Sequence, residues 1–166
     1  LYLLETEPDI VDTPEVAAVF GDNFHPKREN WPVLHGDVTF KDVSFRYKDG
    51  EQVLSHFNLE VKAGQTIALV GETGSGKSTI VNLVCRFYEP TEGSVCIDGV
   101  DYRQRSQLWL QSNLGYVLQS PHLFSGTVAD NIRYGRPDAT EEQVRRAAQM
   151  VNAEGFILKM EHGYDT

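Results

Sequence analysis

Nine residues near the middle of the chain constrain its fold more than any others. They read Gly-Glu-Thr-Gly-Ser-Gly-Lys-Ser-Thr from Gly71 to Thr79, and they stand between an apolar run, Thr66–Val70, and an amphipathic run that follows. Glycine tolerates positive φ angles, so a backbone rich in it can bend until several N–H groups point at one anion. The spacing satisfies the P-loop pattern, which predicts a strand, a phosphate-binding loop and a helix in that order.

Each part of this stretch has a physical task in holding a nucleoside triphosphate. The N-terminus of the following helix presents unpaired N–H groups and its positive dipole end to the phosphates. Lys77 adds a mobile charge for the β- and γ-phosphates, and the Ser78 hydroxyl is suited to Mg²⁺. The simpler alternative is an ordinary glycine-rich turn between a strand and a helix. The candidate phosphate-binding residues are Gly71, Glu72, Thr73, Gly74, Ser75, Gly76, Lys77, Ser78 and Thr79.

Composition and charge limit the remaining possibilities. The 166 residues and the 40% hydrophobic content predict one domain with a tail. Fifteen Lys and Arg against 24 Asp and Glu give a net charge of −9, which argues against a nucleic-acid partner, because such proteins need clustered cations. Cys85 and Cys96 lie in apolar segments without metal-ligand spacing, so we expect buried, reduced thiols. No apolar run is long enough to cross a bilayer, and the missing initiator methionine indicates an excerpt of a longer protein.

The first 36 residues predict a connector, because they are acidic and interrupted by prolines. Within it, Glu15–Phe20 is expected to form a short turn of helix. The apolar start, Leu1–Leu4, fits either the frayed end of a preceding helix or a disordered leader.

From Asp37 onward the pattern predicts a mixed α/β fold. Apolar alternation over 38–47 changes phase at Lys41–Asp42, which indicates a strand with a bulge, and 53–61 resume the alternation after a turn. Thr66–Val70 and Leu114–Leu118 are expected to be buried strands, and 94–97 a hairpin arm before an Asp98–Gly99 turn. Helices are predicted from Lys77 to the stop at Glu89–Pro90 and over 107–111, 127–134, 140–152 and 154–160.

Several stretches in order resemble one family. Tyr47, the P-loop, 89–93 with 97–99, and 119–132 together resemble the nucleotide-binding domain of an ATP-binding cassette (ABC) exporter of the fused half-transporter type. The resemblance implies a P-loop NTPase core with an N-terminal antiparallel β subdomain. It further implies that 1–36 are a linker from a preceding transmembrane domain. Residues 37–166 would then be the N-terminal portion of the cassette, truncated before its signature motif.

The same resemblance assigns roles to residues outside the loop. Tyr47 matches the aromatic residue that stacks on adenine, and Gln119 matches the glutamine that contacts Mg²⁺ and senses the γ-phosphate. An aromatic face can stack on any purine, which makes the first role physically reasonable. Val53 is a further candidate against the base, with plain core packing as an equal alternative. The implied cofactors are ATP and Mg²⁺, with Ser78 and Gln119 as the metal-contacting residues.

The sequence lacks several motifs that ATP hydrolysis requires in the family it resembles. The sequence contains no Leu-Ser-Gly-Gly-Gln signature, no second acidic motif and no switch histidine, and Asp98 is better explained as a turn residue than as that acidic motif. We therefore expect weak nucleotide binding without turnover, and Thr66–Val70 without one hydrogen-bonding neighbour. The resemblance implies a second cassette as partner, identical or different. It also implies a membrane domain that docks at Pro121–Ile132, and a position on the cytoplasmic face of a membrane.

Three alternatives stay open at this point. A P-loop phosphotransferase would share the cradle and could use Arg145–Arg146 as a basic lid, although a solvated helix face explains that pair more simply. A cassette ATPase that acts in repair or translation would lack membrane spans upstream. A nucleotide-regulated docking module would bind without chemistry.

Overall fold

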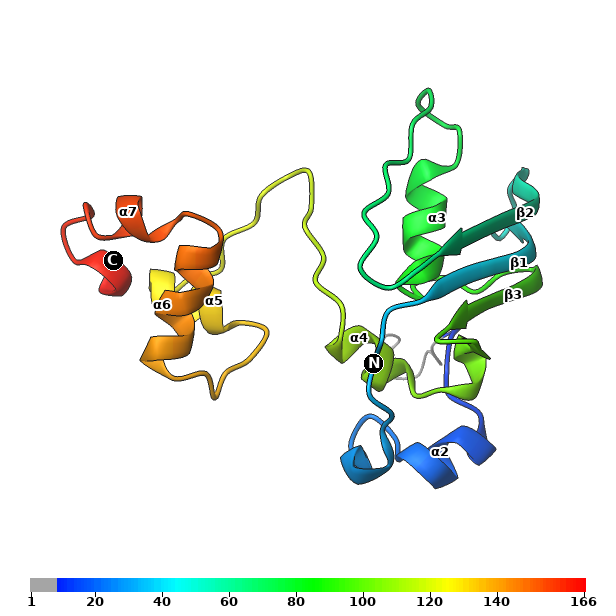
Figure 1. The fold of residues 1–166 in the computed structure, drawn as a ribbon, viewed down its shortest axis with the longest axis horizontal. Coiled ribbons are helices and arrows are strands. Elements are labelled where there is room, and N and C mark those ends of the chain that lie inside the picture. Colours follow the sequence, from blue (N-terminus) through cyan, green and yellow to red (C-terminus); the bar gives the residue numbers. More distant parts are fainter. Residues whose placement is uncertain (1–8) are drawn as a thin grey trace. The chain divides into compact units, whose positions relative to one another are not determined.

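The computed structural model describes residues 9–166, which form two compact units. The first unit extends to Gly115 and contains the sheet, and the second, Tyr116–Thr166, is helical (Figure 1). The expected helix end at Leu1–Leu4 lies outside the described residues. Within residues 9–166, no helix combines the length and the apolar character needed to cross a bilayer.

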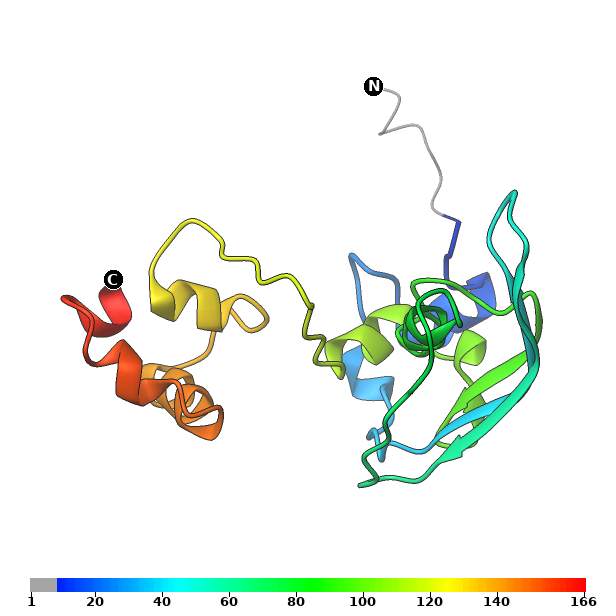
Figure 2. The same cartoon turned by 90° about the horizontal axis from the view of Figure 1, so that it is seen from above.

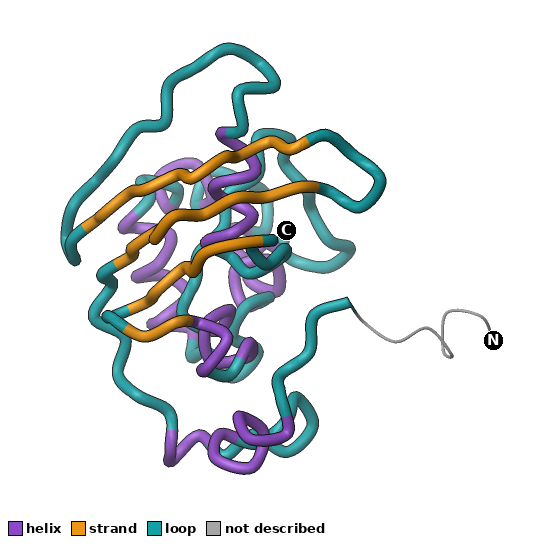
Figure 3. The backbone as a smooth tube through the Cα atoms, turned by 90° about the vertical axis from the view of Figure 1, so that its right-hand side faces the viewer, coloured by secondary structure: helices purple, strands orange, loops and turns teal. Residues whose placement is uncertain are grey.

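The first unit is built on a four-stranded antiparallel sheet, whose strands lie side by side in Figure 3 in the order β2-β1-β3-β4. Phe40 in β1 pairs with Leu59 on one side and with Val95 on the other. The register shifts after Phe40, and Asp42 takes a φ of 51°, which confirms the predicted bulge. The strand bounds are β1 (Val38–Arg46), β2 (Gln52–Val61), β3 (Glu92–Ile97) and β4 (Val100–Asp101).

Two helices cover one face of this sheet, as Figure 2 shows. Helix α3 (Lys77–Val84) buries Ile80 and Leu83, and α4 (Gln107–Ser112) buries Trp109 and Leu110. A short 3-10 turn, η2 (Tyr102–Gln104), precedes α4. The buried core cluster consists of Phe40, Val43, Phe45, Leu54, Ile80, Leu83, Val95, Ile97, Tyr102, Trp109 and Leu110. Cys85 and Cys96 are buried free thiols, as predicted.

The described part of the predicted connector packs onto the same unit. Thr13 caps α2 (Pro14–Phe20), which confirms the predicted helical turn, and η1 (Arg28–Asn30) follows. The indole N–H of Trp31 donates to the carbonyl of Phe20, and the indole N–H of Trp109 in α4 donates to the carbonyl of Pro32. Residues 9–36 are therefore an ordered layer of the first unit.

The second unit consists of α5 (Val128–Arg133), α6 (Glu141–Met150), α7 (Glu154–Ile157) and η3 (Gly163–Asp165). Capping boxes start α5 at Thr127 and α6 at Thr140, and the latter is the box predicted from the sequence. The N–H of Val128 donates to the carbonyl of Thr166, which ties the end of the chain to α5.

Two of the predicted strands are wrong. Neither Thr66–Val70 nor Leu114–Leu118 is a strand, and Val70 and Val117 are 92% and 96% exposed. An inner strand of a parallel sheet forms because neighbours on both sides satisfy its N–H and C=O groups. Among residues 9–166 the only sheet is the antiparallel one, and neither run pairs with it. The expectation that Thr66–Val70 lacks a hydrogen-bonding neighbour is thus confirmed.

Candidate functional site

The glycine-rich loop closes tightly before α3. The N–H of Ser75 donates to the carbonyl of Glu72 at 3.1 Å, and Gly76 caps the helix in the left-handed region with a φ of 93°. A side chain at Gly71 would lie 2.6 Å from the Ser75 hydroxyl oxygen. A larger residue would be strained at Gly76 because of its positive φ, whereas one at Gly71 would have to displace the Ser75 hydroxyl.

The loop ends on the N-terminus of α3, whose first backbone donors are available to an anion. The N–H of Ile80 makes the first turn of the helix by donating to the carbonyl of Gly76 at 3.0 Å. The N–H groups of Lys77, Ser78 and Thr79 precede it and have no intrahelical acceptor. These donors and the helix dipole create a positive end beside the loop.

Lys77 bends back over this loop. Its ammonium group donates to the carbonyl oxygens of Gly71 and, at 3.0 Å, of Glu72. The cation therefore stands over the backbone that the glycines shape, and a phosphate oxygen could replace these carbonyls as its partner. Ser78 is exposed, so its hydroxyl is open to a hard cation such as Mg²⁺.

Two residues of the β1–β2 hairpin contact the loop. Tyr47 follows β1 directly, and its hydroxyl lies 2.9 Å from the hydroxyl oxygen of Thr79, which is 4% exposed. Val53 in β2 lies beside Gly76, where a Cβ would stand 3.4 Å from its side chain. Val53 also packs on the core cluster, as the core alternative expected, and its contact with the base stays a prediction. The β1–β2 hairpin thus carries both candidate base contacts to the phosphate loop.

Gln119 lies in the second unit, in an exposed segment without helix or strand. The structure therefore brings Tyr47, Val53 and Gly71–Thr79 together, whereas the contribution of Gln119 stays a prediction.

Asp98 has a structural role, as its turn position indicates. Its carboxylate accepts hydrogen bonds from the backbone N–H groups of His35, Gly36 and Asp37 at 2.7–2.9 Å. Burial opposes ionisation, yet these bonds hold the pKa of Asp98 below its usual value. The carboxylate is committed to the chain that enters β1, which supports its exclusion as a metal-binding acid.

The basic pair on α6 is a helix face. The Arg145 guanidinium donates to Glu154 at 3.0 Å, and Arg146 is exposed. Both residues lie on the exposed face of α6, as the simpler alternative predicted.

Sequence reasoning missed Tyr88. Its ring contacts the ring of Tyr47 with centroids 5.0 Å apart. The only signal was an aromatic residue near the end of the predicted P-loop helix, and the pattern gave no reason to pair it with a residue 41 positions earlier (88 − 47).

Comparison with known proteins shows which family the sequence of this chain matches. The family described as ABC transporter matches residues 54–162. The uncharacterized ABC transporter ATP-binding protein YfiC of Bacillus subtilis (strain 168) is 49% identical over 135 residues, 81% of this chain and 22% of YfiC. The mitochondrial potassium channel ATP-binding subunit of Xenopus tropicalis is 49% identical over 138 residues, 81% of this chain and 20% of that subunit.

A solved structure agrees with the sequence matches. A bacterial Atm1-family ABC exporter with ATP bound has a TM-score of 0.85 and 36% identity, covering 99% of this chain and 27% of the exporter chain. The α/β fold with its antiparallel sheet is thus that of an exporter nucleotide-binding domain. The chain spans about a quarter or less of the length of these relatives.

Proposed function

We propose that this chain, which belongs to the ABC transporter family, binds ATP together with Mg²⁺ through residues 71–79. The single observation that carries the proposal is the glycine-shaped loop with Lys77 folded over it at the N-terminus of α3. Backbone N–H groups of the loop and the helix would hold the phosphates, and Lys77 would turn its ammonium group from the loop carbonyls to phosphate oxygens.

The other site residues would act at the two ends of the nucleotide. Tyr47 would offer its ring to adenine, with Val53 beside it, because both lie next to the loop on the sheet side. Mg²⁺ would neutralise phosphate charge, and it fits the donor set here, since the exposed Ser78 hydroxyl is a hard oxygen ligand. Gln119 would supply a second oxygen ligand.

The ABC transporter relatives support a proposal for the wider assembly. We propose that residues 1–36 link a transmembrane domain to the cassette portion at 37–166. In the whole protein a second cassette, identical or different, would complete the ATP site. The membrane domain would dock at Pro121–Ile132 on the cytoplasmic face of a membrane, and ATP hydrolysis would drive export.

Calorimetric titration of the chain with Mg·ATP tests the proposal. Lys77→Ala should weaken ATP binding about 10- to 150-fold, because it removes charge-assisted contacts worth ~1.5–3 kcal/mol. Lys159→Ala, an exposed lysine in the second unit, is the matched control and should bind as the wild type does. Equal affinities for all three proteins would mean that the loop is not the site.

A further inference from the structure

Three aromatic rings form a cluster beside the phosphate loop. Tyr47 meets Phe45 and Tyr88 in T-shaped contacts, with centroids 4.7 Å and 5.0 Å apart and both interplanar angles 87°. Phe45 and Tyr88 also meet each other at 5.6 Å. Each edge-to-face pair favours the packed arrangement of its rings by about twofold to more than tenfold, in addition to the effect of the apolar area buried. Such pairs therefore favour one ring orientation.

Tyr47 is therefore held at three points. Phe45 is 4% exposed and belongs to the core, Tyr88 is 43% exposed, and the Thr79 hydroxyl bonds the far end of the Tyr47 side chain. Rotating the ring about its side-chain torsions would break at least one of these contacts. Of the two aromatic neighbours, only Tyr88 stands at the surface, where its replacement leaves the core intact.

The backbone around Tyr88 is anchored to the sheet, which makes it a fixed support. The hydroxyl of buried Tyr102 donates to the carbonyl of Tyr88 at 3.3 Å. Burial raises the pKa of the Tyr102 hydroxyl, so this donor keeps its proton at physiological pH. Three residues on, the N–H of Thr91 donates to the carbonyl of Ser44 in β1 at 2.9 Å.

We propose that Tyr88 is a positioning residue for adenine recognition: it holds the Tyr47 ring in the orientation in which that ring receives the base. The proposal rests on the proposed function, because it takes Tyr47 as the base platform. Tyr88 acts through Tyr47 alone and leaves the phosphate contacts of Gly71–Thr79 untouched. Its role is carried by the ring, since the described contacts of its side chain are the two ring pairs.

Titration with two ligands separates the base from the phosphates. Mg·ATP carries both, and Mg·tripolyphosphate carries phosphates only. Tyr88→Leu should weaken ATP binding about 2- to 10-fold and change tripolyphosphate binding by less than twofold. Tyr88→Phe keeps the ring and should bind ATP as the wild type does. Phe24→Leu, which removes an 88% exposed ring of the same unit, is the matched control and should change neither affinity.

A double-mutant cycle shows whether Tyr88 works through Tyr47. In a Tyr47→Leu background, Tyr88→Leu should cause no further loss of ATP affinity, because the platform is already gone. An additive loss, an equal loss for both ligands, or no loss of ATP affinity would each overturn the positioning role. Should Tyr88→Leu lose the wild-type melting transition, Tyr88→Met, which removes the ring but keeps a flexible apolar side chain, takes its place in the same cycle.

The same titrations distinguish failure of the proposed ATP binding from failure of the proposed role of Tyr88. A wild-type chain that binds neither ligand would contradict the proposed phosphate site. One that binds both with equal affinity would contradict the base platform. A wild type that prefers ATP, combined with any of the three overturning results for Tyr88→Leu, refutes the role of Tyr88 while leaving the ATP site standing.

Discussion

At the scale of single residues, Arg86 is a buried cation held by two carboxylates. It is 1% exposed, sits just beyond α3 with a φ of 55°, and pairs with Asp12 at 3.1 Å and Glu89 at 3.0 Å. Asp12 also accepts the first N–H of α4, from Gln107, at 3.1 Å. A buried guanidinium is tolerated only when its donors are met, so these carboxylates are structural. The connector is thereby fastened to the end of the P-loop helix.

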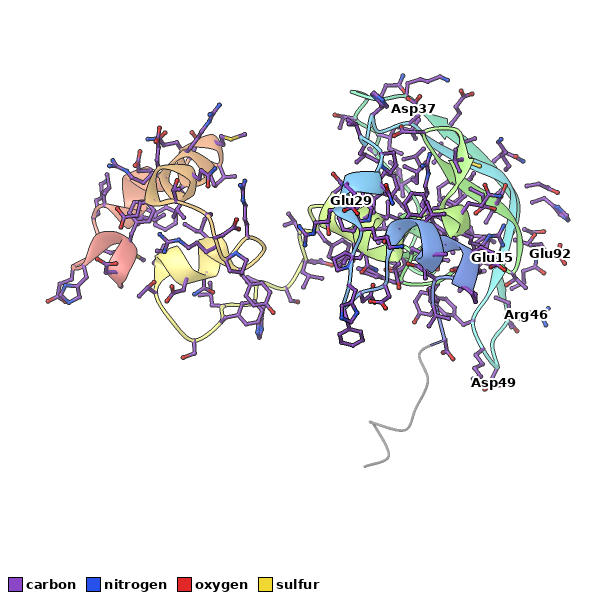
Figure 4. The ribbon with its side chains drawn as sticks, turned by 90° about the horizontal axis from the view of Figure 1, so that it is seen from below. Glu15, Glu29, Asp37, Arg46, Asp49 and Glu92 are labelled. Atoms are coloured by element: carbon purple, nitrogen blue, oxygen red, sulfur yellow. The ribbon has the colours of Figure 1, made fainter. Side chains whose placement is uncertain are left out.

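We expect Asp12→Asn to lower the free energy of unfolding by about 1.5–3 kcal/mol, because it removes one carboxylate from a buried cation. Glu29→Gln, an exposed carboxylate of the same connector (Figure 4), is the control and should stay within about 0.5 kcal/mol of the wild type. Urea unfolding measures both. If the two variants are equally stable, the buried pair does not hold the connector.

Asp98 gives a second prediction, based on pH. Its folded-state pKa is lowered although burial opposes this, so the carboxylate's contribution is complete above the unfolded value of about 3.9 and is lost as the pH falls through the lower folded value. Asp98→Asn should destabilise the chain by about 1 kcal/mol at pH 7 and by progressively less below pH 4. Asparagine fits the left-handed turn before Gly99, so the change isolates the charge.

Unfolding in urea between pH 7 and pH 3 measures this difference. A gap between wild type and variant that stays constant across that range would mean that the three backbone bonds do not depend on ionisation.

At the scale of elements, local patterns predicted what local interactions determine. Alternation identified the β1–β2 hairpin and its bulge, and Thr140 with Gln143 identified the start of α6. The helix after the loop begins at Lys77 as predicted but ends at Val84, before the expected stop at Glu89–Pro90. There Arg86 takes a positive φ and pairs with Asp12, a tertiary interaction that periodicity does not reveal.

The strand predictions at Thr66–Val70 and Leu114–Leu118 failed for a related reason. An apolar run indicates only that a segment prefers burial. A strand also needs partner strands that satisfy its backbone N–H and C=O groups. The candidate site likewise combines a part that the local sequence predicts with a part that depends on tertiary contacts. The spacing of Gly71–Thr79 predicted the loop, whereas the contacts of Tyr47 with Tyr88 and Thr79 depend on how β1 meets α3 and could not be read from spacing.

At the scale of the whole molecule, a net charge of −9 contrasts with a local positive end at the start of α3. Lys77 and the N–H groups of the first helical turn attract a polyanion such as a triphosphate. Because salt screens charges over longer distances, this attraction acts only close to the loop. The candidate base and phosphate contacts all belong to the first unit, while Gln119 and Pro121–Ile132 belong to the second. ATP should therefore be recognised chiefly by the first unit.

The most direct test of this account is the change in backbone amide chemical shifts when Mg·ATP is added to the chain. We predict the largest changes at Gly71–Thr79, followed by Tyr47 and Val53, with small changes along α6 (Glu141–Met150). Saturating Mg·ATP that leaves Gly71–Thr79 unmoved, or that moves α6 most, would contradict the claim that this loop is the nucleotide site.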